Sequence, residues 1–331
     1  MKTALVTGIS GQDGAYLAEL LLKNDYRVVG IIRSYNNSNL LKLRYLNIEK
    51  RVILEECDLM DIPSVISIIK KYKPDEIYNL AAQSSVGLSF EQPIGTITFN
   101  AISVLNLLES IRIVDKSIRF YQASSSEMFG RVTNLPIREE SPMHPLSPYA
   151  ISKATAYWSV VNYRESYGLF ACNGILFNHE SFLRTRNFFV KKIVHSSILI
   201  SRGELNELRV GNIDIRRDFG FAPEYVKPMW LMLRQSKADD YVICSGRSVS
   251  LREIIYHVFD KLGVSRDALV IDQTLFRPTD IVDIYGDNGK AAAQLGWSYN
   301  LPFGNVLDLL IQEELDNWPA AKNAVPGAGW S

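Results

Sequence analysis

The stretch that decides the fold is TALVTGISGQDGAYLAELLLKNDYRVVGIIRS, residues 3–34. Its first apolar run, at 3–7, predicts a short buried strand, and the apolar periodicity of 15–23 predicts a helix. A second apolar run, at 27–32, predicts another buried strand. Three glycines with regular spacing lie between the first strand and the helix: Gly8, Gly11 and Gly14.

A glycine-rich loop between a strand and a helix is suited to binding a dinucleotide. Glycines permit a tight turn and let the backbone approach a pyrophosphate, which then lies at the positive end of the helix. We therefore expect a dinucleotide cofactor here, and the alternative is a purely structural turn. The spacing G-x-x-G-x-x-G is typical of the short-chain dehydrogenase/reductase superfamily.

Strand-like and helix-like segments continue to alternate, with a helix expected at about 147–167 and a strand at 170–177. Alternation of this kind predicts an α/β fold with a Rossmann-type doubly wound parallel sheet. The pattern loosens after about residue 180. We expect three parts: a cofactor-binding Rossmann domain to which later segments can return, a smaller C-terminal mixed α/β lobe that binds substrate, and a poorly ordered tail, at 1–180, 181–318 and 319–331.

The composition excludes several classes of protein. Lys plus Arg and Asp plus Glu number 36 each, so no surface charge favours nucleic acid. Three widely spaced cysteines and four scattered histidines have no metal-ligand or redox spacing, and we expect no metal. No apolar run approaches ~18 residues, so we expect no membrane span. These features indicate a cytoplasmic protein.

The residues after the second strand bear on the choice of cofactor. An acidic residue there would hydrogen-bond a ribose hydroxyl and favour NAD. Arg33 and Ser34 occupy the position instead, and a cation with a hydroxyl suits the 2′-phosphate of NADP. We therefore expect NADP, with NAD less favoured; a solvated arginine is the alternative. Asp58 and Leu59 close the predicted third strand, where an adenine could lie.

Tyr149 and Lys153 are four residues apart in the predicted helix and therefore share one face. A nearby ammonium lowers the pKa of a phenol and lets it exchange a proton with a substrate hydroxyl near neutral pH. The pair follows a strand that ends in three serines at 124–126. The order of glycine loop, serine strand and Tyr-Lys helix predicts a catalytic role for both residues.

Glu127 lies two residues beyond Ser125, where the strand enters a loop. A dehydrogenase that only oxidises a hydroxyl needs no carboxylate there. A sugar dehydratase does, because oxidation at C4 makes the C5 proton acidic and a base must remove it while the C6 hydroxyl leaves. Glu127 therefore favours an elimination reaction, and an ordinary loop carboxylate is the alternative.

Five segments together resemble the GDP-mannose 4,6-dehydratases, which are extended short-chain dehydrogenases acting on nucleotide sugars. They are TGISGQDGAYLAELLL (7–22), PDEIYNLAAQSSV (74–86), FYQASSSEMFG (120–130), SPYAISKATAYW (147–158) and NGILFNHES (173–181). The similarity runs from about residue 3 to about residue 315.

The resemblance implies a GDP-hexose 4,6-dehydratase, a hydro-lyase whose tightly bound cofactor is regenerated in each turnover. It implies that Ser125 binds the C4 hydroxyl, that Glu127 is the C5 base, and that Tyr149 beside Lys153 is the C4 base. The implied cofactor-binding residues are Gly8, Gly11, Gln12, Asp13, Gly14, Arg33, Ser34, Asp58, Leu59, Leu80, Ala82, Ser84, Tyr149, Lys153, His179 and Arg184. The implied substrate-binding residues are Ser84, Ser125, Ser126, Glu127, Asn178, Lys192, Arg217, Arg277 and Asp280.

The segment FLRTRNF at 182–188 departs from the Pro-Arg-Arg-Gly-Glu-Asn-Phe of the family. We expect these changes to remodel the sugar pocket, so GDP-mannose and GDP-N-acetylglucosamine are both candidate substrates. A nucleotide-sugar epimerase or 4-ketoreductase of the same fold is the alternative, and Glu127 discriminates because those reactions need no C5 base there. The resemblance also suggests a homodimer through a helix bundle or a homotetramer through the loop at 33–39.

Overall fold

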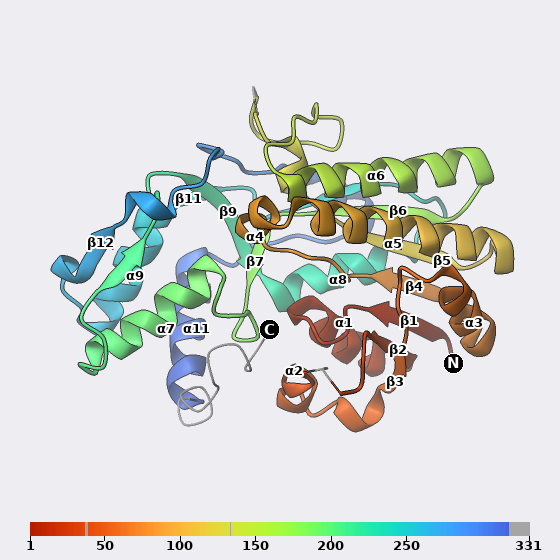
Figure 1. The fold of residues 1–331 in the computed structure, drawn as a ribbon, viewed down its shortest axis with the longest axis horizontal. Helices are drawn as coiled ribbons and strands as arrows, with labels where there is room; N and C mark the ends of the chain where they lie inside the picture. Colours follow the sequence, from red (N-terminus) through yellow and green to blue (C-terminus); the bar gives the residue numbers. More distant parts are fainter. Residues whose placement is uncertain (37–38, 133, 318–331) are drawn as a thin grey trace.

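The structure is a computed structural model, and it describes residues 1–36, 39–132 and 134–317. A seven-stranded parallel sheet has the order β10-β6-β5-β4-β1-β2-β3 (Figure 1). Its strands are β1 Thr3–Thr7, β2 Arg27–Ile32, β3 Ile53–Glu56, β4 Glu76–Asn79, β5 Arg119–Ser125, β6 Ala171–Leu176 and β10 Tyr241–Ile243. The expected Rossmann-type doubly wound sheet is confirmed.

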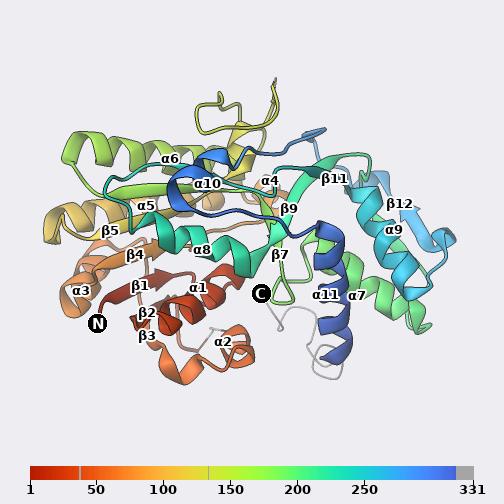
Figure 2. The same cartoon turned by 180° about the vertical axis from the view of Figure 1, so that it is seen from behind.

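Helices cover both faces of this sheet, as Figures 1 and 2 show from opposite sides. One face is covered by α3 Ile62–Tyr72, α5 Pro93–Val114 and α6 Pro148–Tyr167. The other is covered by α1 Gln12–Lys23, α8 Ala222–Met232 and α10 Gly289–Leu295. Two short helices follow strands β2 and β4, namely α2 Leu41–Tyr45 and α4 Val86–Glu91. Since α8, β10 and α10 come late in the chain, segments beyond residue 180 return to this sheet.

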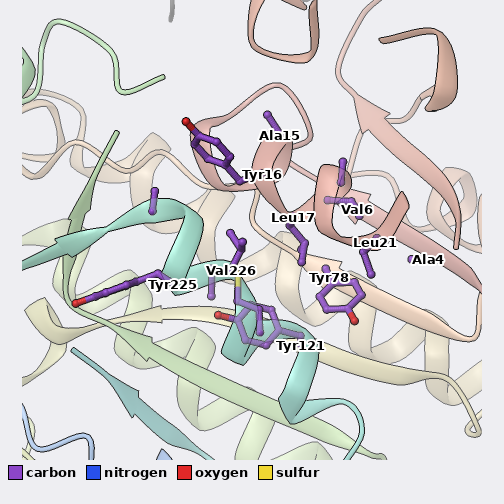
Figure 3. Close-up of a cluster of buried hydrophobic side chains, with 14 of the residues drawn as sticks. Ala4, Val6, Ala15, Tyr16, Leu17, Leu21, Tyr78, Tyr121, Tyr225 and Val226 are labelled. Atoms are coloured by element: carbon purple, nitrogen blue, oxygen red, sulfur yellow. The ribbon is translucent and has the colours of Figure 1, made fainter. Parts of the chain in front are cut away.

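The sequences of β1 and β2 are largely apolar because both of their faces are buried. Leu5 packs with the α3 and α5 side, whereas Val6 packs with the α1 and α8 side. Figure 3 shows Leu17 of α1 and Val226 of α8 approaching Tyr121 of the sheet. Because successive side chains of a strand point to opposite faces of the sheet, one strand contributes to two separate cores.

A smaller lobe lies beside the sheet and has its own apolar core (Figure 1). Its helices are α7 Phe189–Ser201, α9 Leu251–Leu262 and α11 Phe303–Asp316, and a two-stranded sheet pairs β8 Leu208–Val210 with β12 Leu269–Ile271. Between lobe and Rossmann sheet lies a three-stranded sheet, β11 Ser248–Ser250, β9 Arg216–Phe221 and β7 Asn178–Glu180. Single 3-10 turns occur at η1 Glu49–Arg51, η2 Ser126–Phe129, η3 Arg266–Ala268 and η4 Gln273–Leu275.

Several element boundaries differ from those expected. The first helix begins at Gln12 rather than at 15, because Gly11 takes the extended conformation of an N-cap. The Tyr-Lys helix begins at Pro148, where the Ser147 side chain caps the backbone N–H of Ala150. The third strand ends before Asp58, so this residue lies in the following turn. The tail at 319–331 and part of the loop at 33–39 lie outside the described residues.

Helix α5 bears on the expectation that the chain has no membrane span. It has 22 residues and, within the described part of the chain, is the one helix apolar and long enough to cross a membrane by length and composition alone. It packs between α3 and α6 against the sheet (Figure 1). The buried residues Val104, Leu107, Leu108 and Ile111 pack there, as in a core helix, whereas Ile94, Ile102 and Ile113 are exposed.

Candidate active site

Two adjoining cavities lie at the carboxyl ends of the sheet strands. The first, of about 740 Å³, is lined by the glycine loop and the ends of β2 and β4. The second, of about 240 Å³, is lined by the end of β5, the start of α6 and the small sheet. Both are lined by Asp13, Ser84 and Arg184, so these residues stand at the junction. A ligand in one cavity can therefore touch a ligand in the other.

The first cavity contains most of the residues expected to bind a cofactor. The expected residues that line it are Gly8, Gly11, Gln12, Asp13, Gly14, Arg33, Ser34, Asp58, Leu59, Leu80, Ala82, Ser84 and Arg184. The expected residues Tyr149, Lys153 and His179 line the second cavity instead. The expected cofactor residues therefore extend across both cavities.

The glycine loop fits a pyrophosphate by its geometry. Gly8 has φ +66°, and a Cβ there would lie 2.8 Å from the backbone nitrogen of Ala81. A Cβ on Gly14 would meet the carbonyl of Gly8 well inside contact distance. Gly11 is the N-cap residue of α1 and has no side chain that could accept a hydrogen bond from the first turn of the helix. The start of this helix is therefore open to an anion, as dinucleotide binding requires.

A buried lysine in the first cavity escaped the sequence analysis. Lys42 of α2 is only 3% exposed, and its Nζ donates to the Ser10 carbonyl at 3.1 Å. Burial first, and then the charge of Arg184, lower the pKa of Lys42 to about 8. The short segment LKLRYL gave no periodic signal that could have placed this lysine beside the glycine loop. Arg33, in contrast, is exposed, and its guanidinium lies 5.5 Å from the ring centre of Phe99.

The four expected catalytic residues meet in the second cavity. Ser125 ends β5 and caps the 3-10 turn that carries Glu127, accepting its backbone N–H at 3.3 Å. Tyr149 and Lys153 both face this cavity from α6. The Lys153 ammonium donates to the Ala123 carbonyl at 2.8 Å and lies 5.8 Å from the ring centre of Tyr149.

The expected lowering of the Tyr149 pKa is wrong for this structure. Burial raises the pKa of Tyr149 to about 12, opposed by its hydrogen bond to Ser125 and reinforced by the charge of Glu127. Burial also lowers the pKa of Lys153 to about 8. The desolvation of both groups exceeds any effect of the ammonium on the phenol, because the two are enclosed together.

Two arginines line the second cavity, Arg217 from β9 and Arg277 from the loop after β12. Arg217 is buried, and burial lowers its pKa against the charges of Glu127 and Asp280. Asp280 lies 3.3 Å from Arg217 Nη2 and 3.9 Å from Arg277 Nη1. Asp280 does not line either cavity. Its carboxylate lies beside both guanidinium groups and pairs with them.

The remaining expected substrate residues divide into two groups. The residues that line the second cavity are Ser84, Ser125, Ser126, Glu127, Asn178, Arg217 and Arg277. Lys192 lines neither cavity, and its Nζ donates to the Arg209 carbonyl at 2.8 Å. Lys192 lies on α7 and turns toward β8, which helical spacing alone did not reveal.

The residues of the segment at 182–188 lie in different places, some in the core and others along one cavity or both. Phe182 is buried against Tyr45, with ring centres 4.9 Å apart, and against the Lys191 ammonium. Of its first five residues, only Arg184, which matches the family, lines the second cavity. Leu183 and Thr185 line the cofactor cavity. The substitutions at 182, 183 and 185 therefore lie in the core and on the cofactor side.

Comparison with known proteins bears on this site. A sequence model of the family described as GDP-mannose 4,6 dehydratase matches residues 5–309. The chain is 45% identical to GDP-mannose 4,6 dehydratase 1 of Arabidopsis thaliana, with 95% of this chain and 90% of that protein covered. It is 40% identical to GDP-mannose 4,6-dehydratase of Sinorhizobium fredii, with 95% and 97% covered.

Solved structures agree on the fold. The chain matches the dTDP-glucose 4,6-dehydratase DesIV of Streptomyces venezuelae with TM-score 0.85 and 21% identity, over 96% of this chain and 98% of that one. It matches UDP-N-acetylglucosamine 4-epimerase of Methanobrevibacter ruminantium with TM-score 0.82 and 25% identity, over 96% and 99%. With the family match across nearly its whole length, the chain belongs to the GDP-mannose 4,6-dehydratase family.

Proposed function

We propose that this protein is a GDP-hexose 4,6-dehydratase, a hydro-lyase that converts its substrate to a GDP-4-keto-6-deoxy sugar. One observation carries the proposal: Glu127 lines the same cavity as Tyr149 and Lys153, close enough for its charge to raise the pKa of Tyr149. An oxidising pair and a carboxylate base on one cavity suit oxidation followed by elimination.

A bound nicotinamide cofactor supplies the acceptor for hydride from C4 and the donor that returns the hydride to C6. Tyr149 takes the proton of the C4 hydroxyl while Ser125 hydrogen-bonds the same oxygen. Lys153 keeps a positive charge beside the phenolate that forms, which compensates for the burial of Tyr149. Glu127 then takes the C5 proton and passes it to the C6 hydroxyl, which leaves as water. A proton from solvent reaches C5 when the hydride is returned to C6.

The cofactor is NADP in this proposal, and it remains bound between turnovers. The glycine loop supports a dinucleotide through the tight approach of Gly8 and Gly14 to neighbouring backbone. Arg33 and Ser34 line the cavity at the end of β2, where the ribose 2′ substituent of a dinucleotide lies. A cation and a hydroxyl at that position favour a phosphate over a free hydroxyl.

Arg217 and Arg277 bind the diphosphate of the GDP-sugar. Guanidinium groups match phosphate oxygens through paired donors, and a neutral protein must concentrate cations where it binds a dianion. Asp280 supports this role because it fixes the orientation of both arginines without entering the cavity. Asn178 and Ser126, on the same cavity, are left to contact the sugar.

The test is loss of one water from GDP-mannose or GDP-N-acetylglucosamine, followed by mass spectrometry. Conversion of either sugar supports the dehydratase, and conversion of one alone identifies the substrate. If neither sugar loses water but a 4-epimer or a reduced 4-keto sugar forms, the protein is an epimerase or ketoreductase and the assignment to Glu127 is wrong.

We also propose that the enzyme is a homodimer joined through α5 and α6. The two helices pack side by side (Figure 1) and carry exposed apolar residues: Ile102, Ile113, Ile151 and Trp158. Ile102 and Ile113 are about three helical turns apart and Ile151 and Trp158 about two, so each pair shares a face. Trp158→Glu should shift the mass in solution from dimer to monomer, and an unchanged mass would exclude this interface.

A cytoplasmic location is part of the same proposal. Cys57, Cys172 and Cys244 are all buried free thiols, a state suited to a reducing compartment. Fractionation of cells that produce the protein tests it, with activity expected in the cytosolic fraction.

A further inference from the structure

The cofactor cavity is lined by a lysine, Lys42, that is not part of the glycine-loop motif and has no step in the proposed reaction. Lys42 is almost fully buried on α2, a short helix that begins seven residues beyond Ser34. Its Nζ lies 3.1 Å from the Ser10 carbonyl, within the glycine loop. The lysine and Ser10 both line the first cavity, together with Arg33 and Ser34. Lys42 therefore contacts the glycine loop in the same cavity that the end of β2 lines.

Burying an ammonium is costly unless a negative charge compensates for it. The charges that act on Lys42 in this structure are Arg184, which opposes its charged form, and Asp13, which favours it. Arg184 also lies 3.7 Å from buried Glu180, and Asp13 lies 2.9 Å from His179, so each of them has a further partner of opposite charge. An anion placed between the glycine loop and α2 would stabilise both Lys42 and Arg184, and the cofactor's phosphates are the anions this cavity is shaped to receive.

We infer that Lys42 binds a phosphate of the dinucleotide cofactor, a role that rests on the proposed nucleotide-dependent function. The phosphate is either the 2′-phosphate, beside Arg33 and Ser34, or the pyrophosphate, above the glycine loop. A compact ammonium suits either group, because it acts as a point charge with three donors.

The experiment measures the dissociation constants of NADP⁺ and NAD⁺ for wild-type protein and for Lys42→Met, by calorimetry on cofactor-stripped enzyme. Arg44→Met is the matched control, because Arg44 lies on the same helix but is exposed and pairs with Glu49 at 2.8 Å. A charge-assisted hydrogen bond predicts roughly 10- to 100-fold weaker binding in Lys42→Met and no change in Arg44→Met. Lys42→Arg should retain most of the affinity.

Comparison of the affinities for NADP⁺ and NAD⁺ shows which phosphate Lys42 binds. Weaker binding of NADP⁺ alone assigns the 2′-phosphate, and equal weakening of both assigns the pyrophosphate. Unchanged affinity of Lys42→Met for both overturns the inference. Failure of the wild type to bind either cofactor overturns the proposed function instead, so the two failures are distinguishable.

A second measurement on the wild type avoids dependence on the variant's folding. Amine acylation near pH 8, followed by peptide mass spectrometry, reports the accessibility of Lys42 with and without NADP⁺. The inference predicts that NADP⁺ reduces labelling of Lys42 but not of exposed Lys50. Equal labelling of Lys42 with and without NADP⁺ contradicts it.

Discussion

Asp13 in the glycine loop and His179 in β7 are joined by a contact of 2.9 Å between Asp13 Oδ2 and His179 Nε2. The other ring nitrogen, Nδ1, lies 2.7 Å from the Phe177 carbonyl. A carbonyl and a carboxylate only accept hydrogen bonds, so both ring nitrogens donate and His179 is an imidazolium. A charged pair therefore ties the cofactor loop to the sheet that underlies the substrate cavity.

The pair predicts a pH-dependent contribution to stability. Burial opposes the charge on both groups, but their mutual attraction prevails: the pKa of His179 is raised, and that of Asp13 is lowered to about 2. Because the folded-state pKa of His179 is raised, its contribution is complete below its unfolded value of about 6.5 and is lost as pH rises through the folded pKa. The contribution of Asp13 is present above its unfolded value of about 3.9 and is lost as pH falls through about 2.

Asp13→Asn should lower the pKa of His179 in an NMR titration. It should also lower the free energy of unfolding by about 1–3 kcal/mol near pH 6, and by less at a pH above the raised pKa of His179, where the wild type has lost the ion pair. Urea unfolding at both pH values measures the difference. An unchanged His179 pKa would show that Asp13 does not hold the imidazolium.

Glu127→Gln should leave the fold intact and reduce turnover by about 10²–10⁴-fold, because an amide cannot accept the C5 proton. Wild-type enzyme in heavy water should place one solvent deuterium at C5 of the product. Mass spectrometry of the sugar measures both effects. Near-normal turnover in the variant would require another base.

The pKa of Lys153 predicts the pH above which activity declines. Burial lowers its pKa to about 8 in the ligand-free protein, so the ammonium loses its charge as pH rises through that value. Since kcat/KM reports the free enzyme, kcat/KM should fall above about pH 8. Lys153→Arg keeps its charge and should move the decline to higher pH. A decline at the same pH in the variant would assign it to another group.

Gly14→Ala should destabilise the protein by about 1–3 kcal/mol and weaken cofactor binding, because the new Cβ meets the Gly8 carbonyl. Gly95→Ala is the control, since Gly95 lies in α5 and a Cβ there meets nothing within 4 Å. It should stabilise the helix by about 0.5–1 kcal/mol. Thermal unfolding and calorimetry compare the two, and equal effects would contradict the steric account of the loop.

The sequence predicted those parts of the site that depend on local spacing. The glycine loop and the Tyr149–Lys153 pair each follow from one helix or one turn, and both lie where expected. Side chains that depend on tertiary packing were not predictable in this way. Lys192 turns toward β8 rather than the cavity, and Lys42 reaches the glycine loop only because α2 packs there.

The pKa of Tyr149 shows the same limit. A neighbouring lysine in sequence suggested a lowered value, but burial of the pair outweighs that interaction. Burial depends on how α6 meets β5 and the small sheet, which spacing does not encode. Phe182 is similar, because only the fold reveals that its ring packs on Tyr45 rather than facing a sugar.

The central claim is that one active site oxidises C4, eliminates water and returns the same hydride to C6. The most direct test uses GDP-mannose and GDP-N-acetylglucosamine with deuterium at C4, incubated with wild-type enzyme that has its cofactor bound. The account predicts a 4-keto-6-deoxy product that has lost one water and carries the deuterium on C6. A product without deuterium at C6, or a 4-epimer that keeps its water, would contradict it.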